Sequence, residues 1–414
     1  MRIHQLSPCV AGQQRLRSGP LGCHVDGFAE LLLSRGYAKS MVILKARIVA
    51  ELSRWLHKRK YPVENLDEQK VARFLAHKRQ SFSIRQDKAA TLRQLLEYLR
   101  AQGVIPPVVA QIGDSPLSLL ERDFKQYLSE ERALAQSTQI HSFFWMRRFL
   151  SECFGTNRID FQKLDALTIS RFILRNARRF TSSGTTVVMV SSLRHFLRFL
   201  YLRGDIANDL AACVPYVAHW RLSTVPRTLS AAQVEHLLKS CDRRTATGQR
   251  NYAILLLLAR LGLRAGEVVA MQLDDIDWEG GELTVCGKRL RRDRLPLPHD
   301  VGKALAKYLR YGRPRCSTRR AFVRRRAPYE GFASSTTIRS IVCRALGRAG
   351  LDPSTKGANL LRHSLATDML RKGASLSQIG EILRHQNLNT TQIYAKVDLV
   401  ALRKLAQPWP GGET

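Results

Sequence analysis

The sequence predicts a mainly α-helical protein: two similar helical modules in tandem, then a mixed, mostly helical domain with a small antiparallel sheet. Three observations predict this architecture. Apolar residues recur at helical spacing through the first half, two segments of that half resemble each other, and residues 282–298 contain two short runs typical of strands. The chain has 414 residues, enough for roughly two to four domains of about 100–200 residues each.

An internal repeat defines the first two modules. The segment from Leu92 to Ile105 aligns with the segment from Leu193 to Ile206 at a constant offset of 101 residues, and the offset is 98 at Leu66 and Leu164. Loop insertions between equivalent helices produce such small changes of offset. We therefore predict a duplicated helical module of about a hundred residues.

Each copy is predicted to contain four or five short helices. Apolar residues recur three and four positions apart, as at Phe28, Leu31 and Leu32. Gly103 and Gly204 follow the last apolar stripe of each copy, where glycine commonly ends a helix.

Proline-rich and polar stretches predict the domain boundaries. The segment from Pro106 to Pro116 separates the two modules, and residues 219–227 precede a new helical start. The predicted domains are therefore 1–110, 116–218 and 227–406.

The third domain begins with a helix and then changes its pattern. Ser230, with Gln233 three residues later, has the spacing of a capping box. The elements expected after this helix are, in order, a buried helix at 252–263, a turn at 273–277, and strands at 282–286 and 294–298. Helices are expected from there to the end of the domain.

The charge indicates a polyanionic partner. Lys and Arg number 67 against 34 acidic residues, a formal net charge of +33, and the excess is spread along the chain from Arg15 to Arg403. A uniformly basic globular chain favours DNA or RNA, with salt-dependent affinity. An RNA-bound ribosomal type of protein and an anionic membrane surface are the alternatives that charge alone leaves open.

Cysteine usage and hydropathy indicate a soluble, cytoplasmic protein without a metal site. The eight cysteines have no C-x-x-C pair and no ligand-like spacing to histidine. The longest apolar run, 252–263, is shorter than the roughly 18 residues of a membrane span, and the amino terminus lacks an apolar signal core.

Four side chains in the last domain have the chemistry to break a phosphodiester. Arg264 and Arg362 each offer a planar fork of donors that suits phosphate oxygens, and Glu267, one turn after Arg264, is placed to hold that fork. His385 can donate a hydrogen bond, and Tyr394, nine residues later, offers a phenolic nucleophile. Together they predict strand cleavage through a covalent intermediate.

These motifs, in their order and spacing, resemble the tyrosine recombinase (phage integrase) family, including its Xer members. Residues 228–406 look like the catalytic domain of that family, residues 116–215 resemble its core-binding domain, and the first module resembles a second copy of that domain. The resemblance implies that Arg264 and Arg362 bind the phosphate and that His385 supports charge on the phosphorus. It gives Lys288, in the hairpin, the role of protonating the departing 5′-oxygen.

In the same resemblance Tyr394 attacks to form a 3′-phosphotyrosyl linkage, which keeps the energy of the phosphodiester. Religation then requires neither ATP nor a metal, and no cofactor is expected. The predicted catalytic set is Arg264, Lys288, Arg362, His385 and Tyr394.

Two positions depart from the family pattern. Asn359 stands where the family usually has a histidine, and Arg384 stands where it usually has a glycine. Asparagine can donate a hydrogen bond to phosphate but cannot accept a proton as neutral imidazole does, so the group that deprotonates Tyr394 is open. His363, next to Arg362, is expected to point elsewhere from its helix.

The function implied is that of a site-specific recombinase or integrase of a mobile element. Its partner would be double-stranded DNA, bound by a homo-tetramer on two sites or by an assembly with sister recombinases, and no membrane. The tail at 397–405 would pack either on a neighbouring protomer or on its own domain. Two alternatives stay open: a DNA-binding protein without cleavage, since 375–394 superficially resembles a helix-turn-helix, and a type IB topoisomerase.

Overall fold

A computed structural model describes most of the chain, and its contacts group the residues into two compact units. One unit comprises residues 1–106 and 224–414, and the other comprises residues 107–223. The described residues are 10–77, 82–107, 116–155, 159–180, 183–217, 225–287, 292–385 and 387–397. Lys288, the start of the second predicted linker and the tail beyond 397 lie outside them.

The amino-terminal part is a helical bundle with a core of its own. Its buried side chains include Phe28, Leu52 and Leu92, which come from three different helices. The helices are α1 (Val10–Arg17), α2 (Val25–Ser34), α3 (Lys39–Lys58), α4 (Glu68–His77) and α5 (Phe82–Ala101).

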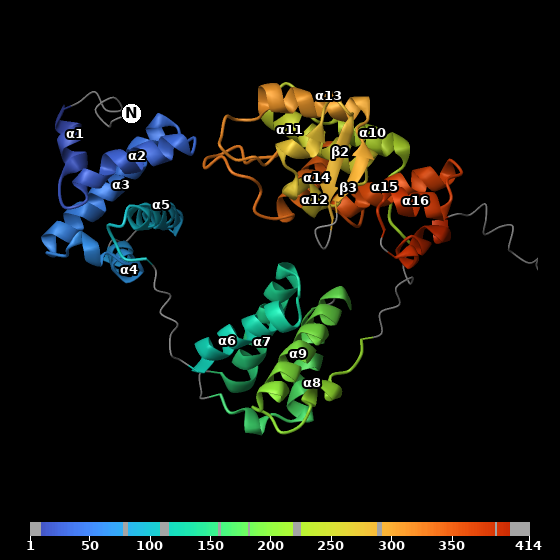
Figure 1. Cartoon of the computed structure of the whole chain (residues 1–414), viewed down its shortest axis with the longest axis horizontal. Helices are drawn as coiled ribbons and strands as arrows, with labels where there is room; N and C mark the ends of the chain where they lie inside the picture. The colour runs from blue at the N-terminus through green and yellow to red at the C-terminus, as the bar shows by residue number, and fades with distance from the viewer. Residues whose placement is uncertain are drawn as a thin grey trace, which may run out of the picture. The chain divides into compact units, whose positions relative to one another are not determined.

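The unit at 107–223 is a second helical bundle, in which the two long helices run side by side (Figure 1). Phe124, Phe149 and Phe196 meet edge to face at its centre, with ring centroids 5.3 to 6.2 Å apart. Such aromatic contacts stabilise the core beyond the burial of apolar area. The helices are α6 (Pro116–Gln126), α7 (Gln136–Phe154), α8 (Ala166–Arg179) and α9 (Ser183–Arg203), of which α7 and α9 are the long pair.

The positions aligned by the internal repeat have the same environment in both copies. Each aligned pair that follows is buried in its own core: Leu92 and Leu193, Leu99 and Leu200, Ile105 and Ile206, Leu66 and Leu164. Gly103 and Gly204 both end a helix with positive φ, at +70° and +79°. The last helix of each copy thus ends in the same way, as the repeat predicts.

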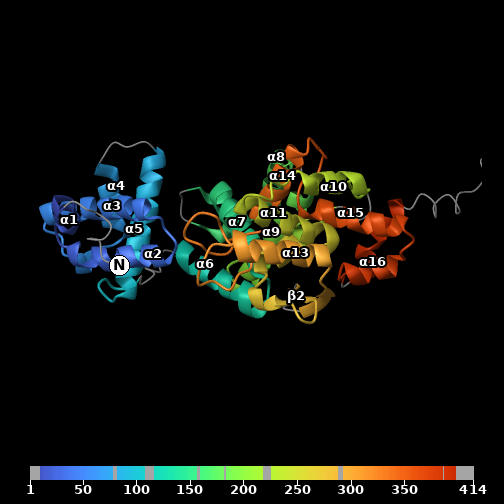
Figure 2. The same cartoon turned by 90° about the horizontal axis from the view of Figure 1, so that it is seen from above.

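The carboxy-terminal part packs its helices around α11, which is buried along most of its length. The helix starts six residues earlier than predicted because Thr245 caps it by accepting a bond from the Gly248 N–H at 3.0 Å. The surrounding helices are α10 (Ala231–Lys239), α12 (Ala265–Ala270), α13 (His299–Lys307), α14 (Thr336–Arg348), α15 (Ala358–Arg371) and α16 (Leu376–Ile382), with α11 itself at Ala246–Arg260. Helix α15 lies beside α16, as Figure 2 also shows.

A three-stranded antiparallel sheet, ordered β1-β2-β3, flanks these helices, so the predicted fold class is confirmed. The strands are β1 (Ile276–Asp277), β2 (Glu282–Cys286) and β3 (Arg292–Pro296). The third strand lies two residues earlier than predicted. Glu282 pairs with Pro296 in the ladder, and Pro298 already caps α13, so the strand ends before it.

Within the described ranges, every helix is too short or too polar to cross a membrane. The division into three domains at 1–110, 116–218 and 227–406 remains a prediction. Three separate apolar cores fall inside those limits, with a smaller fourth cluster around Tyr394.

Candidate active site

The backbone between α11 and α12 positions Arg264. Gly262 ends the preceding segment with φ +57°, and a Cβ there would come within 2.7 Å of the Leu383 side chain. Glycine is therefore required by both its conformation and its close contact with the end of α16. Arg264 follows as the N-cap residue of α12.

Glu267 fixes the guanidinium of Arg264, as the sequence predicted. The carboxylate accepts from Arg264 Nη1 at 2.8 Å and from the Arg264 backbone N–H at 2.8 Å. Its second oxygen also accepts from Arg384 Nη2 at 2.9 Å. Burial alone would raise the pKa of Glu267, but the backbone bond from Arg264 and the charges of Arg384 and Arg264 outweigh it and lower the pKa.

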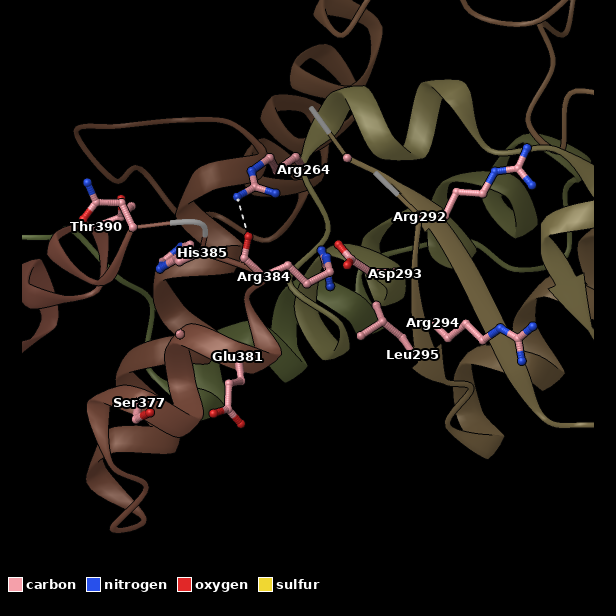
Figure 3. A pocket seen from close by; sticks show the side chains of 13 residues that line it. Arg264, Arg292, Asp293, Arg294, Leu295, Ser377, Glu381, Arg384, His385 and Thr390 are labelled. Atoms are coloured by element: carbon pink, nitrogen blue, oxygen red, sulfur yellow. Dashed lines mark hydrogen bonds between the residues drawn. The ribbon is translucent and has the colours of Figure 1, made fainter. Parts of the chain in front are cut away.

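Arg384 occupies the position of the family's glycine with the backbone conformation that suits glycine, at φ +55°. A non-glycine residue in this region carries a strain of about 1–2 kcal/mol. The side chain turns inward, is only 7% exposed, and ion-pairs with Glu267. Its carbonyl oxygen accepts from Arg264 Nη2 at 3.4 Å, the contact drawn as a dashed line in Figure 3. Arg384 therefore adds a third guanidinium group to the site.

Arg362 lies on α15 and connects three segments of the domain. Its Nη1 donates to the Gly262 carbonyl and its Nη2 donates to the Leu383 carbonyl, so the guanidinium bridges the ends of α11 and α16. Burial, together with the charges of Arg264 and Arg384, lowers the pKa of Arg362 to about 10. Two of the three guanidinium groups, those of Arg264 and Arg384, pair with the single carboxylate of Glu267, so the site has an excess of positive charge that an incoming phosphate would neutralise.

His385 follows directly after Arg384 and is held by Thr391. Its Nδ1 lies 2.8 Å from the Thr391 hydroxyl. With that hydroxyl donating, the neutral ring carries its proton on Nε2 and can donate it to an oxygen. Burial and the charges of Arg362 and Arg264 lower the pKa of His385 to about 4, so the ring is neutral at pH 7.

Tyr394 lies in a short 3-10 segment, Gln392–Val397, and is 1% exposed. Burial raises its pKa to about 12, although the charge of Arg362 acts in the opposite direction. Its Oη lies 2.9 Å from Nδ1 of His363. The sequence interpretation that His363 points elsewhere was wrong. The 3-10 segment packs against α15 and brings the Tyr394 hydroxyl to the side chain of His363.

A pocket of about 870 Å³ is lined by Arg264, Arg384 and His385 on one wall (Figure 3). Arg292 and Arg294, from β3, line it on the sheet side. The pocket is open, and its four arginines outnumber its two carboxylates, Asp293 and Glu381, which suits a phosphate backbone better than an apolar small molecule.

The structure thus brings Arg264, Arg362, His385 and Tyr394 into one region: the charges of Arg362 and Arg264 lower the pKa of His385, and the charge of Arg362 opposes the rise in the pKa of Tyr394. Lys288 lies outside the described residues, between the ends of β2 and β3. Sequence reasoning missed His363 and Arg384 as members of the site. The two departures from the family pattern, at 359 and 384, were the available signals.

Replacement of Glu267 by glutamine is expected to weaken both the site and the domain. The variant leaves two guanidinium groups without their carboxylate, which costs about 3–5 kcal/mol for a buried pair. The pKa of Glu267 is lower in the folded state than its ordinary value of 4.5. The stability that the ionised carboxylate contributes is therefore fully present above pH 4.5 and is lost as the pH falls through the folded-state pKa. Urea unfolding of Glu267→Gln should therefore show a shallower loss of stability below about pH 4.5.

Glu235→Gln provides the control for that measurement. Glu235 pairs with Arg260 at 2.6 Å, but both side chains are substantially exposed, so its loss should cost about 1 kcal/mol or less. Equal acid slopes in wild type and Glu267→Gln would contradict the assignment.

Comparison with known proteins gives the family. Residues 227–399 match the model described as the phage integrase family. A protein named as an integrase/recombinase, y4rA of Sinorhizobium fredii, is 42% identical over 395 residues, covering 95% of each chain. The tyrosine recombinase XerD of Lacticaseibacillus casei is 28% identical over 69% of this chain and 97% of its own.

Solved structures give the same fold. The XerH site-specific recombinase, in a post-cleavage complex with its difH substrate, aligns with a TM-score of 0.55 at 18% identity, covering 70% of this chain and 95% of its own. The Tn1549 transposon integrase, in complex with circular intermediate DNA, aligns with a TM-score of 0.51 at 15% identity, covering 69% and 99%. The sequence identity over nearly the full length of y4rA, together with the family match, shows that this chain belongs to the phage integrase family.

Proposed function

We propose that the chain is a site-specific DNA recombinase that cleaves and rejoins duplex DNA through Tyr394. The observation that carries the proposal is the placement of a buried phenol next to a cluster of guanidinium groups with one carboxylate among them. Such a cluster favours a bound phosphate diester, and the phenol supplies a nucleophile for it. The kinship with y4rA supports recombination or integration as the outcome, and a mobile element as its setting is inferred from the family resemblance.

In this proposal each group has one task. Arg264 and Arg362 bind the non-bridging oxygens. His385 donates a hydrogen bond from its Nε2–H to one of these oxygens as charge grows on the phosphorus. Each well-placed donor of this kind contributes roughly 3–4 kcal/mol to the transition state. Lys288 protonates the departing 5′-oxygen, a role that rests on the family resemblance.

The proposed partner is double-stranded DNA, bound by a homo-tetramer on two sites or with sister recombinases. The formal net charge of +33 supports a polyanionic partner, and the assembly is inferred from the family resemblance. The relatives named above come from bacteria, whose DNA lies in the cytoplasm, and we propose the same location here.

The test is to trap the covalent intermediate. The full chain is incubated with a pool of nicked duplexes whose central sequence is randomised, so that cleavage next to the nick releases a short strand and prevents religation. Protein–DNA adducts stable in SDS are then recovered and sequenced. We expect adducts that share one sequence motif.

Two results would favour the alternatives. Adducts without a common motif, together with relaxation of any supercoiled plasmid, indicate a type IB topoisomerase. A gel shift at low salt without any adduct indicates a binding protein that does not cleave.

A further inference from the structure

Among the described residues, the phenol of Tyr394 is hydrogen-bonded to the imidazole of His363. Nδ1 of His363 lies 2.9 Å from Tyr394 Oη, and the two ring centroids are 5.7 Å apart with the planes tilted by 59°. A separation of 2.9 Å is within the range for an O–H group that donates to a ring nitrogen. The imidazole therefore touches the reacting oxygen itself.

Asn359 cannot perform proton transfer in its place. An amide has no basic nitrogen, so it can donate a hydrogen bond but cannot take up a proton at neutral pH. Asn359 and His363 are one helical turn apart on α15, and both line a second pocket of about 840 Å³. His363, four residues after Asn359, is the histidine that α15 carries.

The surroundings of His363 keep its ring ready to accept a proton. Burial, and next the charge of Arg362, lower its pKa, so the ring is neutral at pH 7. With the phenol donating to Nδ1, the ring proton lies on Nε2. His363 also lines the second pocket.

We infer that His363 is the general base that accepts the phenolic proton of Tyr394 during strand cleavage. This inference rests on the proposed function. An oxygen lone pair of Tyr394 forms the new Oη–P bond, while the O–H proton moves to Nδ1 of His363. The P–O5′ bond breaks with its electron pair on O5′, which takes a proton from the separate acid assigned to Lys288. In religation the imidazolium returns its proton to Oη.

The variant His363→Gln separates the hydrogen bond from proton transfer. A glutamine oxygen can still accept a bond from the phenol but cannot take its proton. We expect its rate of adduct formation on the recovered nicked duplex to fall about 100-fold, with DNA affinity unchanged. His236→Gln is the matched control: His236 is in the same domain, hydrogen-bonded to the Ala349 carbonyl at 3.2 Å, and should leave the rate unchanged.

Two chemical substitutions identify which proton is affected. A fluorinated tyrosine at 394 has a more acidic phenol. The gap in adduct rate between wild type and His363→Gln should therefore narrow to roughly tenfold. A 5′-bridging phosphorothiolate leaves without a proton, so on that DNA the gap should stay near 100-fold. A gap that narrows only with the phosphorothiolate would make His363 part of the leaving-group acid and overturn the inference.

An adduct rate in His363→Gln equal to that of wild type would also overturn the inference. The same holds for a reduced adduct rate whose ratio to wild type is the same with the fluorinated tyrosine and with the phosphorothiolate DNA, and that accompanies a fall in thermal stability. If wild type itself forms no adduct on any duplex, the proposed function fails instead. The two failures are therefore distinguishable in one set of reactions.

Discussion

Replacement of Tyr394 by phenylalanine is expected to abolish covalent adducts while leaving DNA binding intact. Phenylalanine retains the ring that fills the small core around residue 394 and removes only the oxygen that would attack the phosphorus. Adduct formation on the nicked duplex should fall by at least about 1000-fold, because no second nucleophile replaces a lost one. The measurement is an SDS gel for adducts beside a native gel for binding.

Tyr308→Phe is the matched control for this variant. Tyr308 is as buried as Tyr394, and its hydroxyl accepts from the Val323 N–H at 3.4 Å in the same domain. Each substitution removes one hydrogen bond, worth about 1 kcal/mol, so their stabilities should change alike while only Tyr394→Phe loses cleavage. Adducts formed by Tyr394→Phe at a wild-type level would contradict the assignment of the nucleophile.

Replacement of Arg362 by alanine is expected to have the second largest effect, on both chemistry and stability. Loss of a transition-state donor costs about 10²–10³ in rate. The variant also leaves the carbonyls of Gly262 and Leu383 without their donors, and buried unsatisfied groups cost about 1–3 kcal/mol each. Adduct rates and urea unfolding, measured on the same preparation, separate the two effects.

Arg250→Ala provides the control for Arg362→Ala. Arg250 is also buried and donates to a carbonyl, that of Val323, at 3.0 Å. Its removal should destabilise the domain to a similar extent but leave the adduct rate of the folded protein unchanged. Equal rates in the two variants, at a temperature where both are folded, would mean that the Arg362 guanidinium has no role in the chemistry.

The sequence predicted the helical architecture well because its signals are local. Helical spacing of apolar residues, the capping box at Ser230 and the aligned glycines at 103 and 204 each depend on a few neighbouring residues. The internal repeat extended this reasoning over a longer range, and its aligned apolar positions are buried in both copies.

The parts that differ depend on contacts between distant segments. The limits of β3 follow from its register with β2. The contact of His363 depends on how the 3-10 segment at Gln392–Val397 returns to α15, which the periodicity of that helix alone cannot give. The ion pair of Arg384 with Glu267 depends on a positive φ that sequence patterns do not predict for arginine.

The burial of Tyr394 bears on how a cell can tolerate this protein. With a pKa of about 12, roughly one phenol in 10⁵ is ionised at pH 7. Unbound copies therefore have almost no reactive oxyanion with which to nick chromosomes by accident. We therefore expect strand nicking to be rare outside a complex in which a base removes the phenolic proton.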